Sequence, residues 1–249
     1  TTCGQTGRTG PSQAQCDAAY AGTILEGAVT VVGGIQEWVA PATGTYTIEA
    51  LGAQGGDTSH AAGGFGARIK GSLPLSSGST LQILVGQQGL GNSYDGGGGG
   101  GTFAVRSTGP NPTDIAPLVI AGAGGGSNSW SGSDNGAPGS IGTAGTHGLN
   151  NTSGTPGDNG SGGSGSLSSP GGGLLTNGSP PTWSGQTGGG YAFVNGGDGG
   201  DQIDQAQSVG GFGGGGSAHG NSCIGGGGGG GYSGGTGSNN FCNSGGGGG

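Results

Sequence analysis

Four cysteines carry the most reactive side chains of this sequence, and their spacing favours disulfide bonds. Cys3 and Cys16 lie near the start of the chain, and Cys223 and Cys242 lie near its end. A zinc site that adds His219 is the weaker alternative, because no CxxC or HxxxH spacing is present. We pair sequence neighbours, Cys3 with Cys16 and Cys223 with Cys242, and each bond would contribute about 3 kcal/mol in the chain-entropy model. Two disulfides predict a location outside the cell or at its surface.

Three histidines, His60, His147 and His219, are the candidate acid–base groups. Each stands in a glycine-rich stretch without an evident nucleophile and orienting acid, whereas a catalytic triad needs such partners to converge. Solvated loop histidines are therefore the favoured interpretation. The GxGxxG matches arise by chance at this glycine content, since none lies in a βαβ unit, and no GK[ST] phosphate loop occurs. We predict that the chain is not an enzyme and binds no cofactor.

Acidic residues outnumber basic ones by 12 to 4, and the net charge is −8. Asp198, Asp201 and Asp204 form a loose acidic group that could bind calcium, but the spacing differs from that of an EF-hand loop, so no metal is predicted. Four basic residues cannot neutralise a nucleic acid backbone or bind an anionic membrane surface. No apolar stretch approaches about 18 residues, so no membrane span is expected.

The cysteines, histidines and aspartates described above stand in a chain that is dominated by runs of glycine. The chain has 76 glycines among 249 residues, with unbroken runs at residues 96–101 and 225–231. In isolation such a run is a flexible coil, because it buries no side chain and loses much entropy on ordering. The alternative that we favour places bare backbones side by side as polyproline II helices that satisfy one another's N–H and C=O groups.

The unbroken runs are the predicted interior of such a polyglycine II bundle, since an interior helix must be glycine on all three faces. A collagen triple helix is excluded, because the Gly-X-Y period is absent. The composition alone is typical of disorder, yet strand patterns between the runs favour an ordered fold. The predicted bundle core comprises Gly96, Gly97, Gly98, Gly99, Gly100, Gly101, Gly225, Gly226, Gly227, Gly228, Gly229, Gly230 and Gly231.

Short apolar runs and alternating patterns predict an all-β fold, an antiparallel β-sandwich with the glycine bundle inserted. Residues 45–51 alternate cleanly, with Tyr46, Ile48 and Ala50 on one face, as a strand with one wet face should. One N-terminal α-helix is predicted within residues 11–20, where it would hold Cys16 over Cys3. Further strands are predicted at residues 28–32, 35–39, 65–70, 80–85, 102–106, 117–121 and 191–194.

The chain is predicted to have two regions. Residues 1–121 would form mainly the sandwich, with the N-terminal disulfide loop and the first glycine run. Residues 122–249 would form mainly the bundle, with a returning strand near residues 191–194. Trp130, Trp183 and Tyr191 are candidate partner contacts there, although packing of the two tryptophans against the bundle is the favoured alternative, since Trp is mostly buried.

Several stretches resemble the glycine-rich region in the ectodomains of the anaplastic lymphoma kinase and leukocyte tyrosine kinase receptors. The most specific are TTCGQTGRTGPSQAQCDAAY at residues 1–20 and LQILVGQQG at residues 81–89, with further matches at residues 34–52, 96–105, 117–126 and 210–235. They occur in the order of that family and cover roughly half the chain. The resemblance implies a tumour-necrosis-factor-like sandwich with an inserted bundle of glycine-rich polyproline II helices, and it also implies the Cys3–Cys16 disulfide.

These observations favour an extracellular, non-catalytic structural protein that self-assembles into a fibre, sheath or surface layer. An open sheet edge would let a neighbouring copy join. The chain begins Thr1-Thr2-Cys3 and contains no methionine, so we expect a processed product whose export signal, if any, has been removed. One alternative is a recognition or adhesion module that binds a protein or glycan. Another is ice binding, since a flat glycine-rich bundle can present an ordered face.

Overall fold

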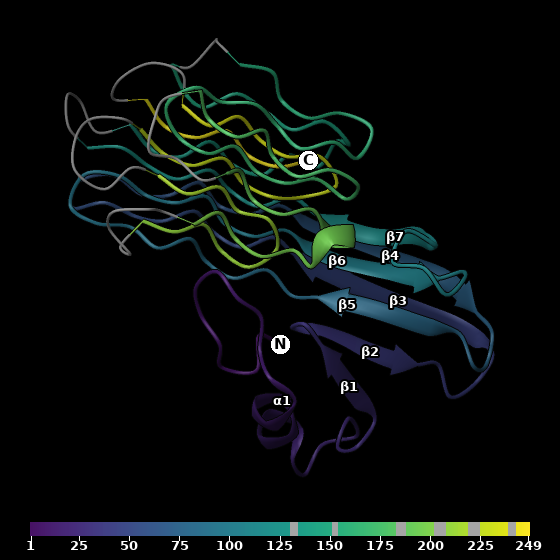
Figure 1. Cartoon of the computed structure of the whole chain (residues 1–249). Coiled ribbons are helices and arrows are strands. Elements are labelled where there is room, and N and C mark those ends of the chain that lie inside the picture. The colour runs from purple at the N-terminus through teal and green to yellow at the C-terminus, as the bar shows by residue number, and fades with distance from the viewer. Residues whose placement is uncertain (130–133, 151–153, 183–187, 202–207, 219–224, 239–242) are drawn as a thin grey trace.

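The described chain folds into a short helix, two antiparallel sheets and a long bundle of extended segments (Figure 1). The computed structural model describes residues 1–129, 134–150, 154–182, 188–201, 208–218, 225–238 and 243–249. The predicted all-β class is confirmed for these residues. In order, the elements are α1 (Gln13–Tyr20), β1 (Val29–Val32), β2 (Ile35–Val39), β3 (Gly44–Leu51), β4 (Arg68–Leu75), β5 (Thr80–Leu84), β6 (Thr102–Ser107), β7 (Ile115–Ala121) and the 3₁₀ helix η1 (Phe193–Asn195).

The larger sheet has five strands in the order β1-β2-β5-β6-β7, and the smaller sheet pairs β3 with β4. All of these pairings are antiparallel. The β1–β2 hairpin turns at Gly33 and Gly34, whose φ angles are 56° and 84°. Two consecutive left-handed residues are what a tight two-residue hairpin loop requires, so the predicted split between these two strands is confirmed.

Strand β6 is buried on both faces and connects the sandwich to the bundle. On one face, Ala104 packs with Ala50 of β3 and Val119 of β7, so the smaller sheet covers this side. On the other face, Phe103 packs against Phe193, with ring centroids 5.2 Å apart. Successive side chains of a strand point to opposite faces, and here each face of β6 meets a different apolar layer. The second layer consists of Leu84, Phe103, Val105, Leu174, Phe193 and Phe212.

Helix α1 begins at Gln13, two residues after the predicted start at Pro11, and Ser12 caps it. The Ser12 hydroxyl accepts a hydrogen bond from the Gln15 N–H, and the Gln15 side chain accepts one from the Ser12 N–H. This capping box satisfies two backbone donors that would otherwise lack helical partners. Cys16 and Tyr20 are the buried residues of the helix, and both face the β1 side of the larger sheet.

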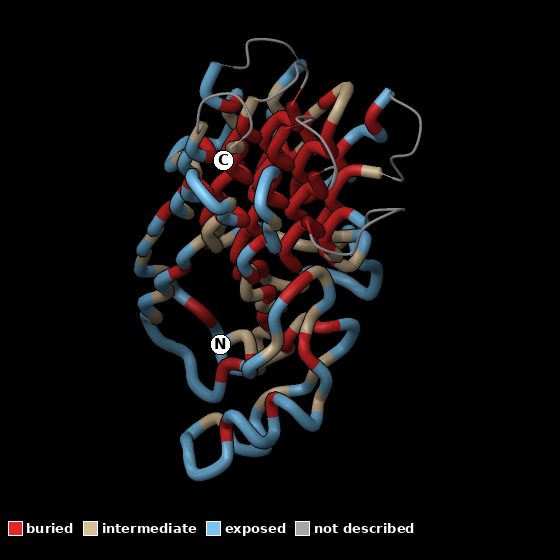
Figure 2. The backbone as a smooth tube through the Cα atoms, turned by 90° about the vertical axis from the view of Figure 1, so that its left-hand side faces the viewer, coloured by how far each residue is buried: buried red, intermediate tan, exposed pale blue. Residues whose placement is uncertain are grey.

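The glycine-rich segments within residues 52–67, 86–101 and 122–249 lie side by side outside the sheets, and we call them the glycine bundle. Figure 2 shows that the buried part of the chain is concentrated there, while the helical end is mostly exposed. Among the described residues of the bundle, η1 is the single helix or strand element. Its order therefore comes from hydrogen bonds between segments rather than within them.

Two predicted strand positions are wrong. Residues 191–194 form no strand: Phe193 begins η1, and the chain then turns through Gly196 and Gly197 with φ angles of 99° and 71°. Strand β4 begins at Arg68 rather than at residue 65, because the preceding residues already pair with the bundle. Phe65 accepts a hydrogen bond from Gly139 at 2.8 Å.

Candidate functional site

The glycine bundle is held by backbone hydrogen bonds between segments far apart in the sequence. Gly98 donates to the carbonyl of Gly216 at 2.8 Å, and Gly216 donates to that of Gly228 at 2.7 Å. Gly230, in the run at residues 225–231, donates to the carbonyl of Gly99, in the run at residues 96–101, at 3.0 Å. The two predicted core runs, residues 96–101 and 225–231, are buried throughout. The buried N–H and C=O groups of each run are thus hydrogen-bonded to those of neighbouring backbones, as burial requires.

Side chains are excluded from this interior by the closeness of the backbones. A Cβ added at any position of residues 96–101 or 226–231 would lie within 3.0 Å of a backbone atom of another segment. At Gly98 the obstructing group is the carbonyl of Gly228, and at Gly230 it is that of Gly213. The glycine requirement is therefore steric at these positions, and the core can carry no side-chain chemistry.

One ionisable side chain, Asp95, is fully buried at the edge of the core. Its Oδ1 accepts hydrogen bonds from Asn128 Nδ2 at 2.6 Å and from the Gly225 N–H at 3.1 Å. Its Oδ2 has no hydrogen-bond partner. Desolvation raises the pKa of Asp95 to about 7, against the opposing effect of both hydrogen bonds. The sequence analysis missed this residue, because nothing in the pattern around it distinguishes it from a loop aspartate.

A mostly apolar cleft of about 460 Å³ lies between the two sheets, beside β3. Its floor includes Trp38 of β2 and Leu81 and Ile83 of β5, and Ile48 of β3 forms one side. Tyr20, the last residue of α1, also lines the cleft. The five-stranded sheet thus presents part of its inner face to a space that the two-stranded sheet does not cover.

The phenol of Tyr20 is fixed by a hydrogen bond to Gln36 Oε1 of β2 at 2.5 Å. Gln36 is itself buried, and its amide nitrogen donates to the carbonyl of Thr1 at 2.8 Å. The disulfide between Cys3 and Cys16, the pairing that the sequence predicts, closes the same N-terminal unit. These links hold one side of the cleft in place.

The described residues that the sequence suggests as partner contacts, acid–base groups or calcium ligands, among them Tyr191, Asp198 and Asp201, do not line this cleft. Tyr191 is 42% exposed on the bundle, and its N–H donates to the carbonyl of Asp198 at 2.8 Å. Asp201 forms an ion pair with Arg8 at 3.2 Å. Burial raises the pKa of Asp198, and the nearby Arg8 opposes that effect.

Part of the predicted set lies outside the described residues, namely Cys223, Cys242, Trp130, Trp183, Asp204 and His219. Within the described ranges, no group of three or more His, Cys, Asp or Glu side chains could hold a metal ion. His60 lines a shallow surface depression formed by residues 54 and 57–62.

The chain matches no model of a known protein family, but part of it is similar to a receptor. Over 93 residues it is 43% identical to the leukocyte tyrosine kinase receptor of Mus musculus, and the aligned part covers 35% of this chain and 10% of the receptor. The match thus spans about a tenth of that receptor's length. Together with the Cys3–Cys16 disulfide, it supports an extracellular chain related to a receptor ectodomain. None of the described helices is long and apolar enough to cross a membrane.

Proposed function

We propose that this chain is an extracellular, non-catalytic recognition module that binds a protein or glycan from a rigid frame. In this proposal the frame consists of a tumour-necrosis-factor-like sandwich and a polyglycine II bundle. The observation that carries the proposal is the interior of the bundle, where backbones alone fill the space between residues 96–101 and 225–231. Such an interior gives a rigid support to the side chains around it and offers no reactive group of its own.

The partial similarity to a receptor supports recognition over a purely structural role. That similarity covers 35% of this chain, and a binding role would use exposed side chains at the ends of the bundle. Tyr191 is one such side chain among the described residues. Aromatic residues are enriched at the binding hot spots of protein interfaces, so Trp130, Trp183 and Tyr191 remain the first candidates.

A binding screen against a glycan array and a panel of secreted proteins tests this function. We expect saturable binding that falls by about tenfold or more when Trp130, Trp183 and Tyr191 are replaced by alanine, the loss of a typical hot spot. Ile141→Ala is the matched control, because Ile141 is an apolar side chain that is 83% exposed. Binding that survives the triple substitution would remove these residues from the proposal, and a screen without any binder would remove recognition itself.

The frame itself is tested by amide exchange. The proposal expects slow exchange throughout residues 96–101 and 225–231, because each amide is buried in a hydrogen-bonded interior. The amides of residues 21–27, an exposed loop before β1, provide the internal reference for fast exchange. Exchange as fast as this loop in the two glycine runs would refute a packed polyglycine core.

A second candidate function is the self-assembling building block of a fibre, sheath or surface layer. Within the described residues no strand pairs with the second edge of β3, and this favours the building block, since an open edge is a template for pairing between copies. Sedimentation and electron microscopy over a wide concentration range decide between the two functions. Filaments would favour the building block, whereas monodisperse particles at every concentration would count against it.

A further inference from the structure

The outer face of the five-stranded sheet carries two neighbouring polar side chains that the described chain leaves without partners. Glu37 of β2 and Gln82 of β5 stand opposite each other in the register, which places their Cβ atoms about 5 Å apart. Their chain neighbours Trp38 and Leu81 line the cleft on the inner face, so these two side chains point outward. Both residues are partly buried, yet among the described residues no hydrogen bond or ion pair reaches either side chain. A ligand that pairs with both would offset the unfavourable partial burial of these groups.

These two side chains line a groove of about 330 Å³. The other described lining residues come from the β1–β2 hairpin, from the loop between β6 and β7, and from η1 and the turn after it, namely Val32, Gly33, Ile35, Gly109, Pro110, Asn111, Pro112, Phe193, Val194 and Gly196. Glu37 is the one charged residue in this described lining. The volume is near the lower end of the range of about 300 to 1,000 Å³ for ligand sites, which suits one small chemical group on a short stem.

Both strands that carry these side chains have their two edges occupied. Strand β2 pairs with β1 on one side and with β5 on the other, and β5 also pairs with β6. A further strand, from any part of this chain or from another chain, therefore cannot pair with the backbone of β2 or β5. A ligand in this groove has to be recognised through side chains.

The loop between β6 and β7 is held in place beside the groove. The N–H and the Nδ2 of Asn111 donate to Asp114 Oδ2 at 3.0 and 2.8 Å. The Asp114 N–H in turn donates to the carbonyl of Asn111 at 2.9 Å. Pro110 and Pro112 restrict the backbone on either side. The groove is thus largely preformed, which reduces the entropy that binding would lose.

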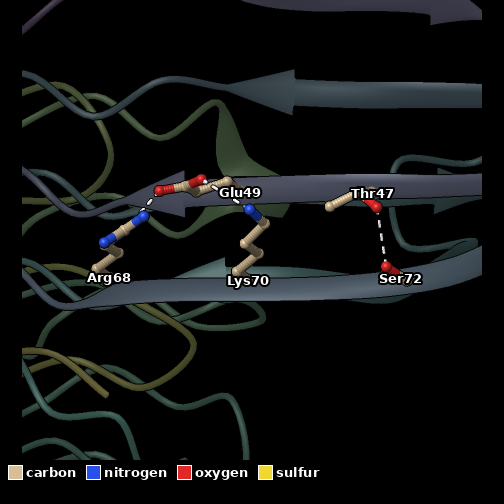
Figure 3. Close-up of polar contacts among 5 residues, drawn as sticks. All are labelled: Thr47, Glu49, Arg68, Lys70 and Ser72. Atoms are coloured by element: carbon tan, nitrogen blue, oxygen red, sulfur yellow. Dashed lines mark hydrogen bonds and ion pairs between the residues drawn. The ribbon is translucent and has the colours of Figure 1, made fainter.

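The basic residues of the chain leave Glu37 available to a cation from outside. Arg68 donates to Glu49 Oε1, and Lys70 Nζ lies 3.7 Å from Glu49 Oε2, so two cations flank one carboxylate of β3 (Figure 3). None of the four basic residues of the chain is among the described residues that line the groove. Glu37 is therefore a carboxylate without a cation of its own, in a chain whose net charge is −8.

We propose that this groove binds a guanidinium group on an apolar stem, carried by a small molecule or by an arginine of a partner protein. A carboxylate accepts two parallel N–H bonds from such a group, and the amide oxygen of Gln82 would accept a third. The apolar stem would contact Ile35 and Val194, which line the same groove. This inference rests on the proposed recognition function and names the chemical group that is recognised.

Other classes of ligand fit these residues less well. An ammonium group is more strongly hydrated than a guanidinium group, so its transfer into a partly apolar groove is less favourable. Calcium takes about six to eight oxygen ligands, whereas the described lining offers a single carboxylate. A phosphate or sulfate group would be repelled by Glu37. The guanidinium group is therefore the ligand that the groove favours.

The test compares butylguanidinium with butylurea, which has nearly the same shape but no charge. On addition of butylguanidinium, nuclear magnetic resonance should show saturable changes in the amide shifts of Glu37, Gln82 and Val194. Butylurea should bind at least about tenfold more weakly, since hydrogen bonds to a charged group are the stronger ones. The binding of butylguanidinium should also weaken as salt is added, because ions screen the attraction. Equal binding of the two probes, or an affinity that salt does not change, would overturn the proposal.

Two matched variants locate the bound cation. Glu37→Gln keeps the size of the side chain and removes its charge, so the affinity for butylguanidinium should fall by about tenfold or more. Glu49→Gln is the control, because Glu49 already pairs with Arg68 and Lys70, and it should keep the affinity within about twofold. Equal losses in the two variants would mean that the probe follows the overall negative charge, and the proposal would be wrong. If circular dichroism shows that Glu37→Gln is unfolded, the comparison of the two probes on the unmodified chain decides the question.

A blocked Gly-Arg-Gly peptide, with citrulline in place of arginine as its neutral control, identifies the source of the group. Tighter binding of the arginine peptide than of butylguanidinium would assign the groove to a protein partner. Weaker binding would assign it to a small molecule, and the site is supported in both cases. Replacing Trp130, Trp183 and Tyr191 by alanine should leave the binding of butylguanidinium unchanged, so this inference and the proposed function can fail separately.

Discussion

Asn128 donates a 2.6 Å hydrogen bond to Oδ1 of Asp95 within the buried part of the bundle. The same oxygen accepts the N–H of Gly225, the first residue of the longest glycine run. A single carboxyl group therefore connects three segments that are far apart in the chain. Its protonation should affect the stability of the whole bundle.

The stability of the chain should fall as the pH rises from about 4 to about 7. Burial raises the pKa of Asp95 from 3.8 to about 7, so the folded chain keeps a proton that the unfolded chain releases. Stability falls with pH wherever the folded state binds more protons, and the loss should be on the order of 3 kcal/mol. Urea denaturation at several pH values measures it. Asp95→Asn should flatten this slope, and an identical slope in both proteins would contradict the assignment.

Adding one methyl group to the glycine core should destabilise the chain strongly. The new Cβ of Gly98→Ala would collide with the carbonyl of Gly228, and overpacking of this kind costs about 1 to 3 kcal/mol or more. Gly142→Ala is the matched control, since its Cβ would meet only the Ser140 hydroxyl, at 3.3 Å. Urea denaturation should separate the two variants. Similar midpoints for both would show that the interior is looser than the structure indicates.

Loss of the Cys3–Cys16 disulfide should loosen the N-terminal unit while the bundle stays protected. The bond joins residues separated by 13 positions, and its removal should cost about 3 kcal/mol if it acts through the unfolded chain. The double substitution Cys3→Ala and Cys16→Ala avoids leaving an unpaired thiol. Limited proteolysis should then cleave within residues 1–27 first. Simultaneous loss of amide protection in residues 96–101 would contradict this local effect.

Removing the phenol oxygen of Tyr20 should cost more than removing that of Tyr46. The Tyr20 hydroxyl bonds to buried Gln36, whereas the Tyr46 hydroxyl bonds to the carbonyl of Ala42 at an exposed site. An unsatisfied buried acceptor costs about 1 to 3 kcal/mol, while an exposed one can bind water. Thermal unfolding of Tyr20→Phe and Tyr46→Phe compares the two. An equal shift in midpoint would mean that Gln36 finds another donor.

Much of the sandwich could be predicted from the sequence, because alternation is a local signal. Residues 45–51 alternate so clearly that β3 was predicted to within one residue, with Tyr46, Ile48 and Ala50 on the inner face. The pairing of Cys3 with Cys16 follows from proximity in the chain. The failure at residues 191–194 has a non-local cause, since Phe193 packs against Phe103 and the chain then turns at Gly196.

The cleft beside β3 could not be predicted, because it depends on which strands lie opposite each other. Trp38 and Ile83 read as ordinary core positions in the sequence, yet both are only partly buried where they line the cleft beside the small β3–β4 sheet. Asp95 was missed for a similar reason. Its burial comes from the segments around residues 128 and 225, which no local pattern connects to it.

The hydrogen bonds of the glycine bundle also set a condition on biosynthesis. Gly229 donates to Gly246 at 2.8 Å, and Gly248 donates to Ala123 at 2.9 Å, so early segments complete their bonding only after residues 245–249 have left the ribosome. Until then the nascent bundle has no internal substitute for these partners, since its glycines carry no side chains. The glycine-rich segments should therefore stay largely unstructured during synthesis. The bundle should then form late, in a slow folding step, because its contacts are long-range.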